Sequence, residues 1–393
     1  MLSISIAELY LYLVVIQPVI GILLFPLGKF SKKAVKALPI LSLTLLSYSF
    51  FELSNKAWDK VILVEMGGFS FLLDSLANIF SAVVLLIGFL CILYSYGYMS
   101  SNDSIERYYF WMLTFIASML LLVSANSILL LIASWELTGL CSFSLISHWN
   151  FKEQSLKGAY RALVITEIGS SMLIAGLFLL EKSYGISNVM EIAQPNVQPG
   201  VVSGIALTLI IIAIASKSVQ YPLHIWLPDA MYAPTPVSAL LHAATMVKAG
   251  VYLLARFWKL YLLVPGFFYG VFLLLGSLTM VIGGMFMLRE NDLKRLLAYS
   301  TVSQIGYMIS SLGLGTILGL FAGIYHLVNH AIVKGLLFLS AGVVEHETGT
   351  RKLKHLGGLV HSMPLTTVAF LVGALSLSGI PPLNCFVSKW IIY

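Results

Sequence analysis

Residues 215–250 read ASKSVQYPLHIWLPDAMYAPTPVSALLHAATMVKAG. This stretch is the most informative part of the chain for predicting its fold. Lys217 stands at the foot of an apolar run, and Pro222 follows five residues later, where an α-helix loses its hydrogen-bond ladder. After a short polar turn the sequence re-enters an apolar helix that holds His242 and Lys248. Ionisable groups inside membrane helices are costly and mark routes for ions or protons. The stretch therefore predicts a broken membrane helix whose charged groups are candidate functional residues.

The composition predicts a polytopic membrane protein. Of 393 residues, 59% are hydrophobic and only 10% are charged, with a mean hydropathy of +0.93, whereas soluble domains carry roughly 25% charged residues. The formal charge of +6 comes from basic residues spread over loops, which indicates membrane topology and argues against a nucleic-acid partner. Cys91, Cys141 and Cys385 lie in apolar segments at scattered spacings, so neither a disulfide framework nor a zinc site is expected.

Twelve segments are apolar over roughly the 20 residues that a spanning helix needs. The first is interpreted as a retained helix, because no basic region or small-residue cleavage site marks it as a signal peptide. The longer loops expected are 54–72, 181–202 and 343–362. The twelve predicted spans are 5–27, 36–53, 73–98, 108–124, 127–147, 158–180, 203–224, 233–258, 264–287, 296–312, 317–342 and 363–391.

Lysine and arginine in the loops predict the orientation of the chain. With the N-terminus outside, the inside loops hold 14 basic residues and the outside loops hold 5. Cytoplasmic loops are enriched in lysine and arginine. We therefore expect the N-terminus and the C-terminal end of the sequence on the outer side.

Segments seven and twelve share a pattern that predicts an internal repeat. The twelfth contains SLSGIPPLNCFVSKW, in which Pro381 and Pro382 break the helix close to Lys389. The two segments are five apart, so equivalent helices run in opposite senses, and inverted repeats with matching broken helices are typical of secondary transporters. The predicted domains are three N-terminal helices in 1–106, a first repeat in 107–260 and a second repeat in 261–393 that lacks its expected last helix.

Glu136, about ten residues into segment five, is the first candidate site residue, and we expect Lys217 to be its partner. Paired, each ion keeps the other charged, whereas separation in an apolar medium favours the neutral form of both. A change in their distance is thus a way to load or release a proton. The alternative is a glutamate that braces two helices. Glu167 lies near the middle of segment six without an assigned partner, and function and packing stay open there.

His326, His330 and Lys334 follow one another at i, i+4 and i+8, which places them along one stripe of a helix. Such a stripe can pass protons through intervening water, and histidine titrates near neutral pH. Histidines satisfied by hydrogen bonds in a core are the alternative. A zinc site is not expected, because the spacing offers neither a third ligand nor a catalytic glutamate.

The remaining candidates lie in segments eight and twelve. His242 and Lys248 are interpreted as sharing one helix, six residues apart, so that they face different sides and belong to successive steps of a path. Lys389 is expected to have a transport role, with a lysine that extends to the membrane surface as the alternative. Three loop residues are expected to serve topology and helix capping: Asp229, Lys294 and Arg295.

Several strings resemble the antiporter-like subunits of respiratory complex I, a family shared with Mrp-type sodium/proton antiporters and membrane-bound hydrogenases. They are WELTGLCSFSLI, SKSVQYPLHIWLPDAMYAPTPVSALLHAATMVKAGVYLLAR, NDLKRLLAYSTVSQIGYM, YHLVNHAIVKGLLFLSAG and SLSGIPPLNCFVSK. The similarity runs from about Phe69 to the end of the sequence. Where some members carry TRxGD in segment six, this chain has Thr166, Glu167 and Ser170, so a switching role for a basic residue is not carried over.

The resemblance implies an all-α membrane protein with fourteen core helices, of which about twelve are expected here, in two inverted five-helix repeats. It also implies a set of proton-carrying residues: Glu136, Lys217, His242, Lys248, His326, His330, Lys334 and Lys389. No cofactor and no metal are expected, since the sequence has no Walker, Rossmann, haem or iron–sulfur pattern. The implied partners are a second antiporter-like subunit, small membrane subunits, the lipid bilayer and protons, with Na⁺ as an alternative ion.

Three functions follow as expectations. The first is a proton-translocating subunit of a complex I-like or hydrogenase-like redox complex, without a redox centre of its own, in an energy-transducing membrane such as the prokaryotic cell membrane. The second is a subunit of an Mrp-type Na⁺/H⁺ antiporter. The third is a structural spacer that transports nothing.

Overall fold

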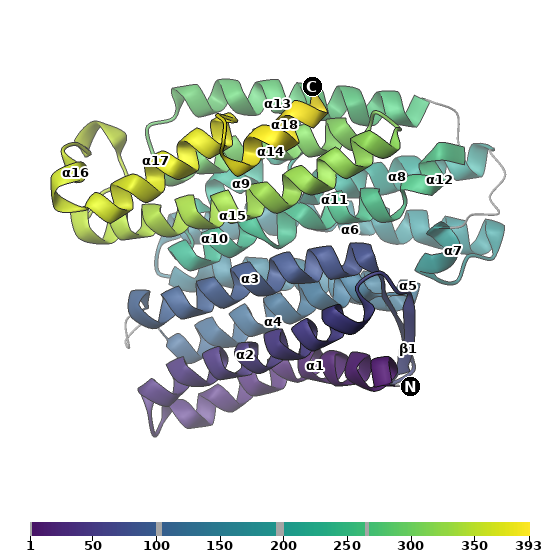
Figure 1. Cartoon of the computed structure of the whole chain (residues 1–393), viewed down its shortest axis with the longest axis horizontal. Coiled ribbons are helices and arrows are strands. Elements are labelled where there is room, and N and C mark those ends of the chain that lie inside the picture. The colour runs from purple at the N-terminus through teal and green to yellow at the C-terminus, as the bar shows by residue number, and fades with distance from the viewer. Residues whose placement is uncertain (1, 100–103, 194–199, 264–266) are drawn as a thin grey trace.

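The structure is a computed structural model that describes residues 2–99, 104–193, 200–263 and 267–393. Long helices lie side by side, and a single short hairpin is the only sheet in the part described (Figure 1). Within these ranges, nine helical segments are long and apolar enough to cross a membrane, with Thr235–Arg256 counted as one segment. The predicted class, an all-α polytopic membrane protein, is confirmed.

The N-terminal helices match the first three predicted spans. Ser31 caps the second helix and Asp74 caps the third, each by accepting a backbone N–H with its side chain. The elements are α1 (Leu2–Gly28), α2 (Lys32–Ala57), β1 (Ile62–Met66), β2 (Phe69–Leu73) and α3 (Ser75–Tyr98).

The strands β1 and β2 form an antiparallel hairpin inside the predicted loop 54–72, which the sequence analysis did not foresee. Gly67 and Gly68 connect the strands with φ values of 60° and 81°. Two consecutive residues of positive φ suit the tight hairpin turns that glycine permits.

The next helices follow the predicted spans until the seventh. They are α4 (Ile105–Ser124), α5 (Ile128–Ile146), η1 (Ser147–Trp149), α6 (Glu153–Tyr184), α7 (Val189–Ala193) and α8 (Val201–Lys217). The predicted span 203–224 is too long at its end, since α8 stops at Lys217, before Pro222. Residues 218–234 instead form short turns around η2 (Leu223–Ile225), α9 (Trp226–Asp229) and η3 (Ala230–Tyr232).

The predicted eighth span consists of two helices, α10 (Thr235–Ala243) and α11 (Met246–Arg256). Ala244 and Thr245 leave the helical conformation, with φ/ψ of −132°/−21° and −118°/−112°. The interpretation that His242 and Lys248 share one helix is therefore wrong. The sequence carries no proline or glycine at this break, and for that reason it was missed.

The C-terminal part contains the second broken helix, where it was expected. The elements are α12 (Trp258–Leu263), α13 (Phe267–Arg289), α14 (Leu293–Leu312), α15 (Ile317–Thr348), η4 (Leu353–His355), α16 (Leu359–Ser362), α17 (Pro364–Ser378) and α18 (Asn384–Ile392). The chain leaves the helix at Gly379, whose φ is +84°, and resumes it at Asn384. The start of the predicted span 264–287 and part of the predicted loop 181–202 lie outside the described residues.

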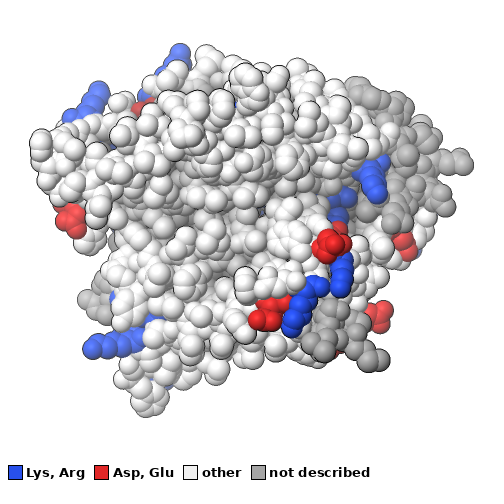
Figure 2. All heavy atoms as spheres, in the orientation of Figure 1, with Lys and Arg blue, Asp and Glu red and all other residues white. Residues whose placement is uncertain are grey.

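The loops gather at the two ends of the bundle. The N-terminus, β1, α7 and α12 lie at one end in Figure 1, and α16 lies at the other. Figure 2 shows a face on which uncharged side chains predominate and charged ones stand in a few groups. This distribution suits a surface in contact with lipid. The side of the membrane that each end faces, and the division into repeats, stay predictions.

Candidate functional site

Lys217 ends α8 inside the protein, with an exposed fraction of 1%. Its ammonium group donates to the backbone carbonyl of Trp135 and to Thr138 Oγ1, the latter at 2.7 Å, and lies 4.1 Å from the centre of the Trp135 ring. Trp135 and Thr138 are three residues apart on α5 and so share the face that packs toward α8. A carbonyl, a hydroxyl and an aromatic face thus surround this cation.

The expected ion pair between Glu136 and Lys217 is absent from the described residues. The two groups make no contact within 4.0 Å, but the Glu136 carboxyl group lies close enough for its charge to act on the Lys217 ammonium group. The carboxyl group of Glu136 instead hydrogen-bonds to that of Glu167 on α6. The added Cβ of a residue at Gly139 would lie 3.0 Å from Glu167 Oε1, which confirms how closely α6 approaches this face of α5. The carboxyl groups of Glu136 and Glu167 are thus neighbours between α5 and α6.

Lys248 and His242 lie on either side of the break between α10 and α11, and both side chains are fully buried. Lys248 donates to the backbone carbonyl of Leu327 on α15, at 3.0 Å. The His242 ring packs against Phe338, with 4.5 Å between ring centres, and neither of its nitrogens has a hydrogen-bond partner among the described residues. Both groups therefore face α15 from the broken helix.

The predicted stripe on α15 is present and fully buried. His326 hydrogen-bonds to Gln304 on α14 and Ser388 on α18, each at 2.9 Å. The ring of His330 lies 6.4 Å from that of His326, and the part of the chain that is described offers its nitrogens no partner. Lys334 donates to Ser300 Oγ and to the carbonyl of Leu297, the latter at 2.9 Å. The stripe thus has three different environments.

Lys389 lies just after the second helix break, with an exposed fraction of 8%. Its ammonium group donates to the carbonyl of Leu377 at 2.7 Å and lies 5.1 Å from the centre of the Tyr307 ring. A cavity of about 400 Å³ borders it, with Ser300, Ser303 and Gln304 among the polar residues of its wall. Lys389 is therefore the candidate lysine that borders a cavity.

The sequence analysis missed the residues that hold these charged groups. Thr138, Ser300, Gln304 and Ser388 are uncharged and common in membrane helices, so nothing in the sequence singles them out. The one usable signal is that Ser388 directly precedes Lys389. The described residues contain no group of three or more His, Cys, Asp or Glu side chains arranged to hold a metal ion.

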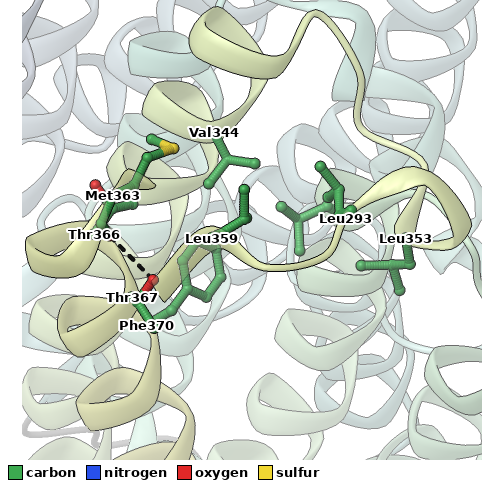
Figure 3. A pocket seen from close by; sticks show the side chains of 9 residues that line it. Leu293, Val344, Leu353, Leu359, Met363, Thr366, Thr367 and Phe370 are labelled. Carbon is green, nitrogen blue, oxygen red and sulfur yellow. Dashed lines mark hydrogen bonds between the residues drawn. The ribbon is translucent and has the colours of Figure 1, made fainter. Parts of the chain in front are cut away.

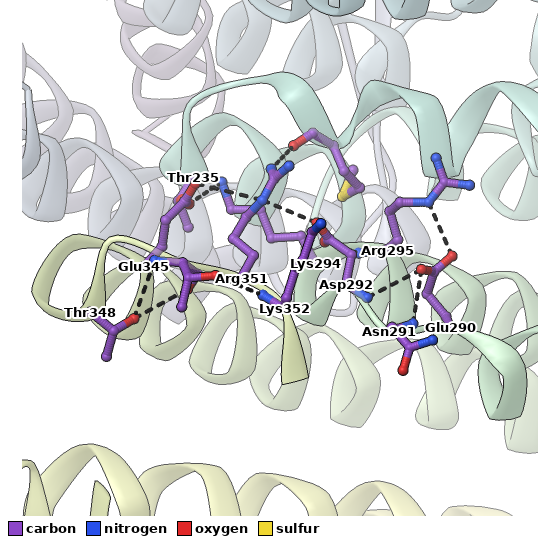
Figure 4. Close-up of polar contacts among 12 residues, drawn as sticks. Thr235, Glu290, Asn291, Asp292, Lys294, Arg295, Glu345, Thr348, Arg351 and Lys352 are labelled. Atoms are coloured by element: carbon purple, nitrogen blue, oxygen red, sulfur yellow. Dashed lines mark hydrogen bonds and ion pairs between the residues drawn. The ribbon is translucent and has the colours of Figure 1, made fainter. Parts of the chain in front are cut away.

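The three residues expected in loops lie in helices, because Asp229 ends α9 and Lys294 and Arg295 belong to the first turn of α14, and all three join helices together. Asp229 forms ion pairs with Arg161 of α6 and with Arg295 of α14, the latter at 3.1 Å. Lys294, with an exposed fraction of 1%, pairs with Glu345 of α15 at 2.7 Å. This set defines the polar cluster, part of which Figure 4 shows, with Asp292, Glu345 and Arg351 facing one another.

Glu290 extends the polar cluster into the turn between α13 and α14. Partial burial alone would raise the pKa of its carboxyl group. Hydrogen bonds from Arg295 and from the backbone N–H groups of Asn291 and Asp292 outweigh burial and hold the pKa below its ordinary value of 4.5. Glu290 is therefore an anion at neutral pH that holds Arg295 beside Asp229.

A second cavity, of about 230 Å³, lies between α14, α15 and the segment that leads into α17 (Figure 3). Its lining is apolar except for the hydroxyl groups of Thr366 and Thr367, and Thr367 donates its hydrogen to the carbonyl of Met363. None of the candidate charged residues borders it. This cavity therefore plays no part in the candidate site.

The sequence matches the profile of a family described as the transmembrane part of NADH:quinone oxidoreductase and Mrp antiporters over residues 124–393. The chain belongs to this family. Residues 67–109 also match the N-terminal part of chain 5 of NADH-ubiquinone oxidoreductase, complex I. The chain is therefore an antiporter-like membrane subunit, and the resemblance seen in the sequence is confirmed.

Individual relatives of the antiporter-like family support the assignment. The chain is 41% identical over 329 residues to the A/B subunit of a probable K⁺/H⁺ antiporter of Rhizobium meliloti, a match that covers 83% of this chain and 33% of that protein. It is 37% identical over 404 residues to the A1 subunit of a Na⁺/H⁺ antiporter of Staphylococcus haemolyticus, a match that covers 96% of this chain and 50% of the relative. The chain thus spans half or less of the length of these curated relatives.

Two solved structures share the fold of the whole chain. A chain of the Mrp complex from Dietzia sp. superposes with a TM-score of 0.86 at 35% identity, covering 100% of this chain and 42% of the other. A chain of the membrane-bound sulfane sulfur reductase, an archaeal respiratory membrane complex, superposes with a TM-score of 0.87 at 27% identity. This match covers 100% of the present chain and 80% of the other. Chains of an antiporter complex and of a respiratory complex therefore share this architecture.

Proposed function

We propose that the chain carries protons across the membrane as one component of a cation/proton antiporter complex of the Mrp type. Four lysines support this proposal, because each is buried and none has a carboxylate within 4.0 Å among the described residues: Lys217, Lys248, Lys334 and Lys389. A buried cation without a counter-ion is strongly destabilising. Groups of this kind persist in membrane helices where they serve ion or proton transfer.

The order of the groups along the protein supports a continuous route. Lys248 contacts α15, along which His326, His330 and Lys334 follow one another one turn apart, and His326 contacts α18, which carries Lys389. Each lysine donates to backbone carbonyls or hydroxyl groups, which are acceptors for the ammonium group but do not fix its charge as a carboxylate would. These lysines can therefore exist with or without the extra proton.

The exchanged ion and the partners are inferred from the relatives. The two curated relatives are named as Na⁺/H⁺ and K⁺/H⁺ antiporter subunits, so an alkali cation is the proposed counter-substrate. The similar solved chains belong to multi-subunit membrane complexes, and we infer further membrane subunits as partners here. The prokaryotic cell membrane is the proposed location.

The test uses the complete complex in membrane vesicles loaded with a pH-sensitive dye. Addition of Na⁺ or K⁺ should change the internal pH in the wild type. Lys217→Ala should abolish this change while the complex still assembles, because the variant lacks the proton-carrying ammonium group. Lys182→Ala is the matched control, since that lysine lies exposed at the end of α6. Cation-dependent proton movement that persists in Lys217→Ala would contradict the proposal.

The redox-linked pump, which the sequence analysis placed first, is the second candidate function. The similarity to a chain of the sulfane sulfur reductase supports it. Proton movement that requires an electron donor and does not depend on Na⁺ or K⁺ would favour the redox-linked pump over the antiporter. A spacer role would be favoured if Glu136→Gln and Lys389→Ala both left cation- and donor-dependent transport unchanged.

A further inference from the structure

His326 is held by hydroxyl and amide groups from two other helices. Its Nε2 atom lies 2.9 Å from Gln304 Oε1 on α14, and its Nδ1 atom lies 2.9 Å from Ser388 Oγ on α18. His326 and Ser388 are fully buried, and Gln304 is 6% exposed. The imidazole thus bridges three helices at one level of the membrane.

The amide oxygen of Gln304 fixes the tautomer of the ring. A carbonyl oxygen only accepts hydrogen bonds, so His326 Nε2 must carry a hydrogen and donate it. In the neutral ring Nδ1 is then the acceptor, and the Ser388 hydroxyl group donates to it. The atom of His326 at which a proton is gained or lost is therefore Nδ1, on the side of α18.

Ser388 can satisfy both protonation states of His326 by rotating its hydroxyl hydrogen. The carbonyl of Cys385 lies 3.1 Å from Ser388 Oγ and is a second acceptor for that hydrogen. When His326 is neutral, the hydroxyl hydrogen points to Nδ1. When the ring is protonated, Nδ1–H donates to Oγ and the hydroxyl hydrogen turns to the Cys385 carbonyl. Neither state leaves a hydrogen bond of His326 broken.

A cavity borders Gln304, at one end of this bridge, and Lys389. The cavity of about 400 Å³ has room for on the order of ten water molecules. Its wall runs from Leu293, at the start of α14, to Gln304 and Lys389. At 1.5 Å per residue, the step from Leu293 to Gln304 covers about 16 Å, roughly half of a 30 Å hydrocarbon core. The cavity therefore reaches mid-membrane depth from the end where the polar cluster lies.

We propose that Ser388 is a proton relay between Lys389 and His326 Nδ1, and that Gln304 positions His326 for it. This inference rests on the proposed function. The ammonium group of Lys389 gives a proton to a cavity water, a water proton passes to Ser388 Oγ, and the hydroxyl hydrogen passes to Nδ1. One N–H bond of Lys389 breaks, one N–H bond forms on His326, and Ser388 and the water end unchanged.

Other titratable groups around His326 determine the electrostatic potential at its ring. They are Tyr307 from α14, whose ring lies 6.1 Å away, Lys248 from α11, Lys389 from α18, and His330 one turn along α15. The ring of Tyr307 also lies beside the Lys389 ammonium group. A protonated His326 is thus repelled by two lysines unless one of them is neutral, which couples the relay to the charge of Lys389.

The first experiment measures cation-dependent proton transport of the complete complex in vesicles at equal amounts of assembled protein. We expect Ser388→Ala to lower the rate by about 100-fold, as loss of a proton-transfer group does. Ser388→Thr keeps a hydroxyl group and should restore most of the rate. Ser49→Ala is the control, because that buried serine also donates to the carbonyl three residues earlier, far from the site. A Ser388→Ala rate and pH profile equal to those of the wild type would overturn the relay.

The role of Gln304 is tested by the pH profile. Gln304→Glu keeps the shape of the side chain and places a carboxylate at Nε2–H, which favours the protonated ring. We expect the transport rate of this variant to fall and its profile to move to higher pH. An unmoved profile would contradict a positioning role for Gln304.

The second experiment reads the tautomer directly and needs no transport. Nitrogen-15 NMR of histidine-labelled complex, with the His326 signals assigned by their loss in His326→Gln, should show hydrogen on Nε2 and a bare Nδ1 in the neutral ring. In Ser388→Ala the Nδ1 signal should shift while Nε2 stays protonated. Hydrogen on Nδ1 instead would disprove the bridge. A wild-type complex that moves no protons would refute the proposed function, and NMR would still decide the relay geometry.

Discussion

The two broken helices place a lysine beside a proline-containing break, but they enclose it differently. Most residues of 218–234 are buried, and the Lys217 side chain at the end of α8 is enclosed and contacts α5. None of the residues 379–383 is buried, and Lys389 borders a cavity. Among the described residues, the first lysine is thus enclosed by protein, whereas the second borders a cavity. The break supplies a place for the lysine, while the packing of neighbouring helices decides what reaches it.

The strongest test of this difference is to replace one closely packed glycine near each helix break by alanine, which adds one methyl group. A Cβ at Gly169 would overlap the Ser216 side chain and lie 3.4 Å from the Cα of Ala213, so Gly169→Ala must push α8 away from α6. We expect about 3 kcal/mol of destabilisation, at the upper end for overpacking, and loss of transport. Thermal unfolding in detergent measures it.

The matched substitution in the second half is Gly373→Ala. Its Cβ would lie 2.7 Å from Cδ2 of Leu337, the end of a flexible side chain that can move. We expect Gly373→Ala to lower the free energy of unfolding by less than about 1 kcal/mol. Equal losses for the two variants would show that both halves are packed alike.

The next largest effect is expected at the partner of Lys217. Thr138→Val keeps the shape of the side chain and removes the hydroxyl group that accepts from the ammonium group. A hydrogen bond to a charged group contributes about 2 kcal/mol, so transport should fall by more than about tenfold. Thr208→Val is the control, since Thr208 is exposed on α8 and donates only to its own helix.

The matching substitution in the second half is Tyr307→Leu, which removes the aromatic ring beside Lys389. We expect a smaller loss of transport than in Thr138→Val, because a cation–π contact contributes only about 1 kcal/mol.

A smaller effect is expected from Asp229→Asn, which removes the negative charge that pairs with Arg161 and Arg295 next to the first helix break. The carboxylate is 21% exposed, so each ion pair is partly screened, and we expect about 1 kcal/mol in unfolding free energy. Glu153→Gln, which removes an exposed i,i+4 pair with Lys157, is the matched control and should change almost nothing. An Asp229→Asn protein as stable as the wild type would mean that the loop is held by packing alone.

The smallest effect concerns acid stability. The pKa of Glu290 is lowered in the folded protein, so its charge stabilises the fold above its ordinary pKa of 4.5, and this contribution disappears as the pH falls through the lower folded value. Glu290→Gln should therefore lower the unfolding temperature slightly at pH 7. The gap between variant and wild type should close as the pH falls through the lowered pKa of Glu290. A gap independent of pH would show that the side chain acts by packing.

The sequence predicted what depends on local composition. Apolar runs located the spans, and Pro381 and Pro382 located the second break, because the backbone restriction of proline is a property of the residue itself. The end of α8 was placed too late, since the helix stops at Lys217 rather than at Pro222. The break between α10 and α11 has no such residue, so tertiary packing rather than local propensity decides it.

The contacts of the site could not be predicted, because they depend on how each helix is rotated about its axis. Glu136 was expected to pair directly with Lys217, but Trp135 and Thr138 contact the lysine instead. Glu136 hydrogen-bonds to Glu167 and acts on Lys217 only through its charge. In the same way, the stripe on α15 followed from its spacing, whereas its partners on α14 and α18 did not. Periodicity identifies a face, and only the structure shows what covers it.

The ion pairs at the two ends of the bundle restrict how this protein can move. Asp229 joins α6 to α14 at one end, and Arg256 of α11 binds Asp74 before α3 at the other, with distances of 2.5 and 2.9 Å. Rocking one half of the molecule against the other, as many secondary transporters do, would break these pairs. If the chain transfers protons as proposed, we expect the transfer to proceed by rotation of side chains and rearrangement of water rather than by rocking of the two halves.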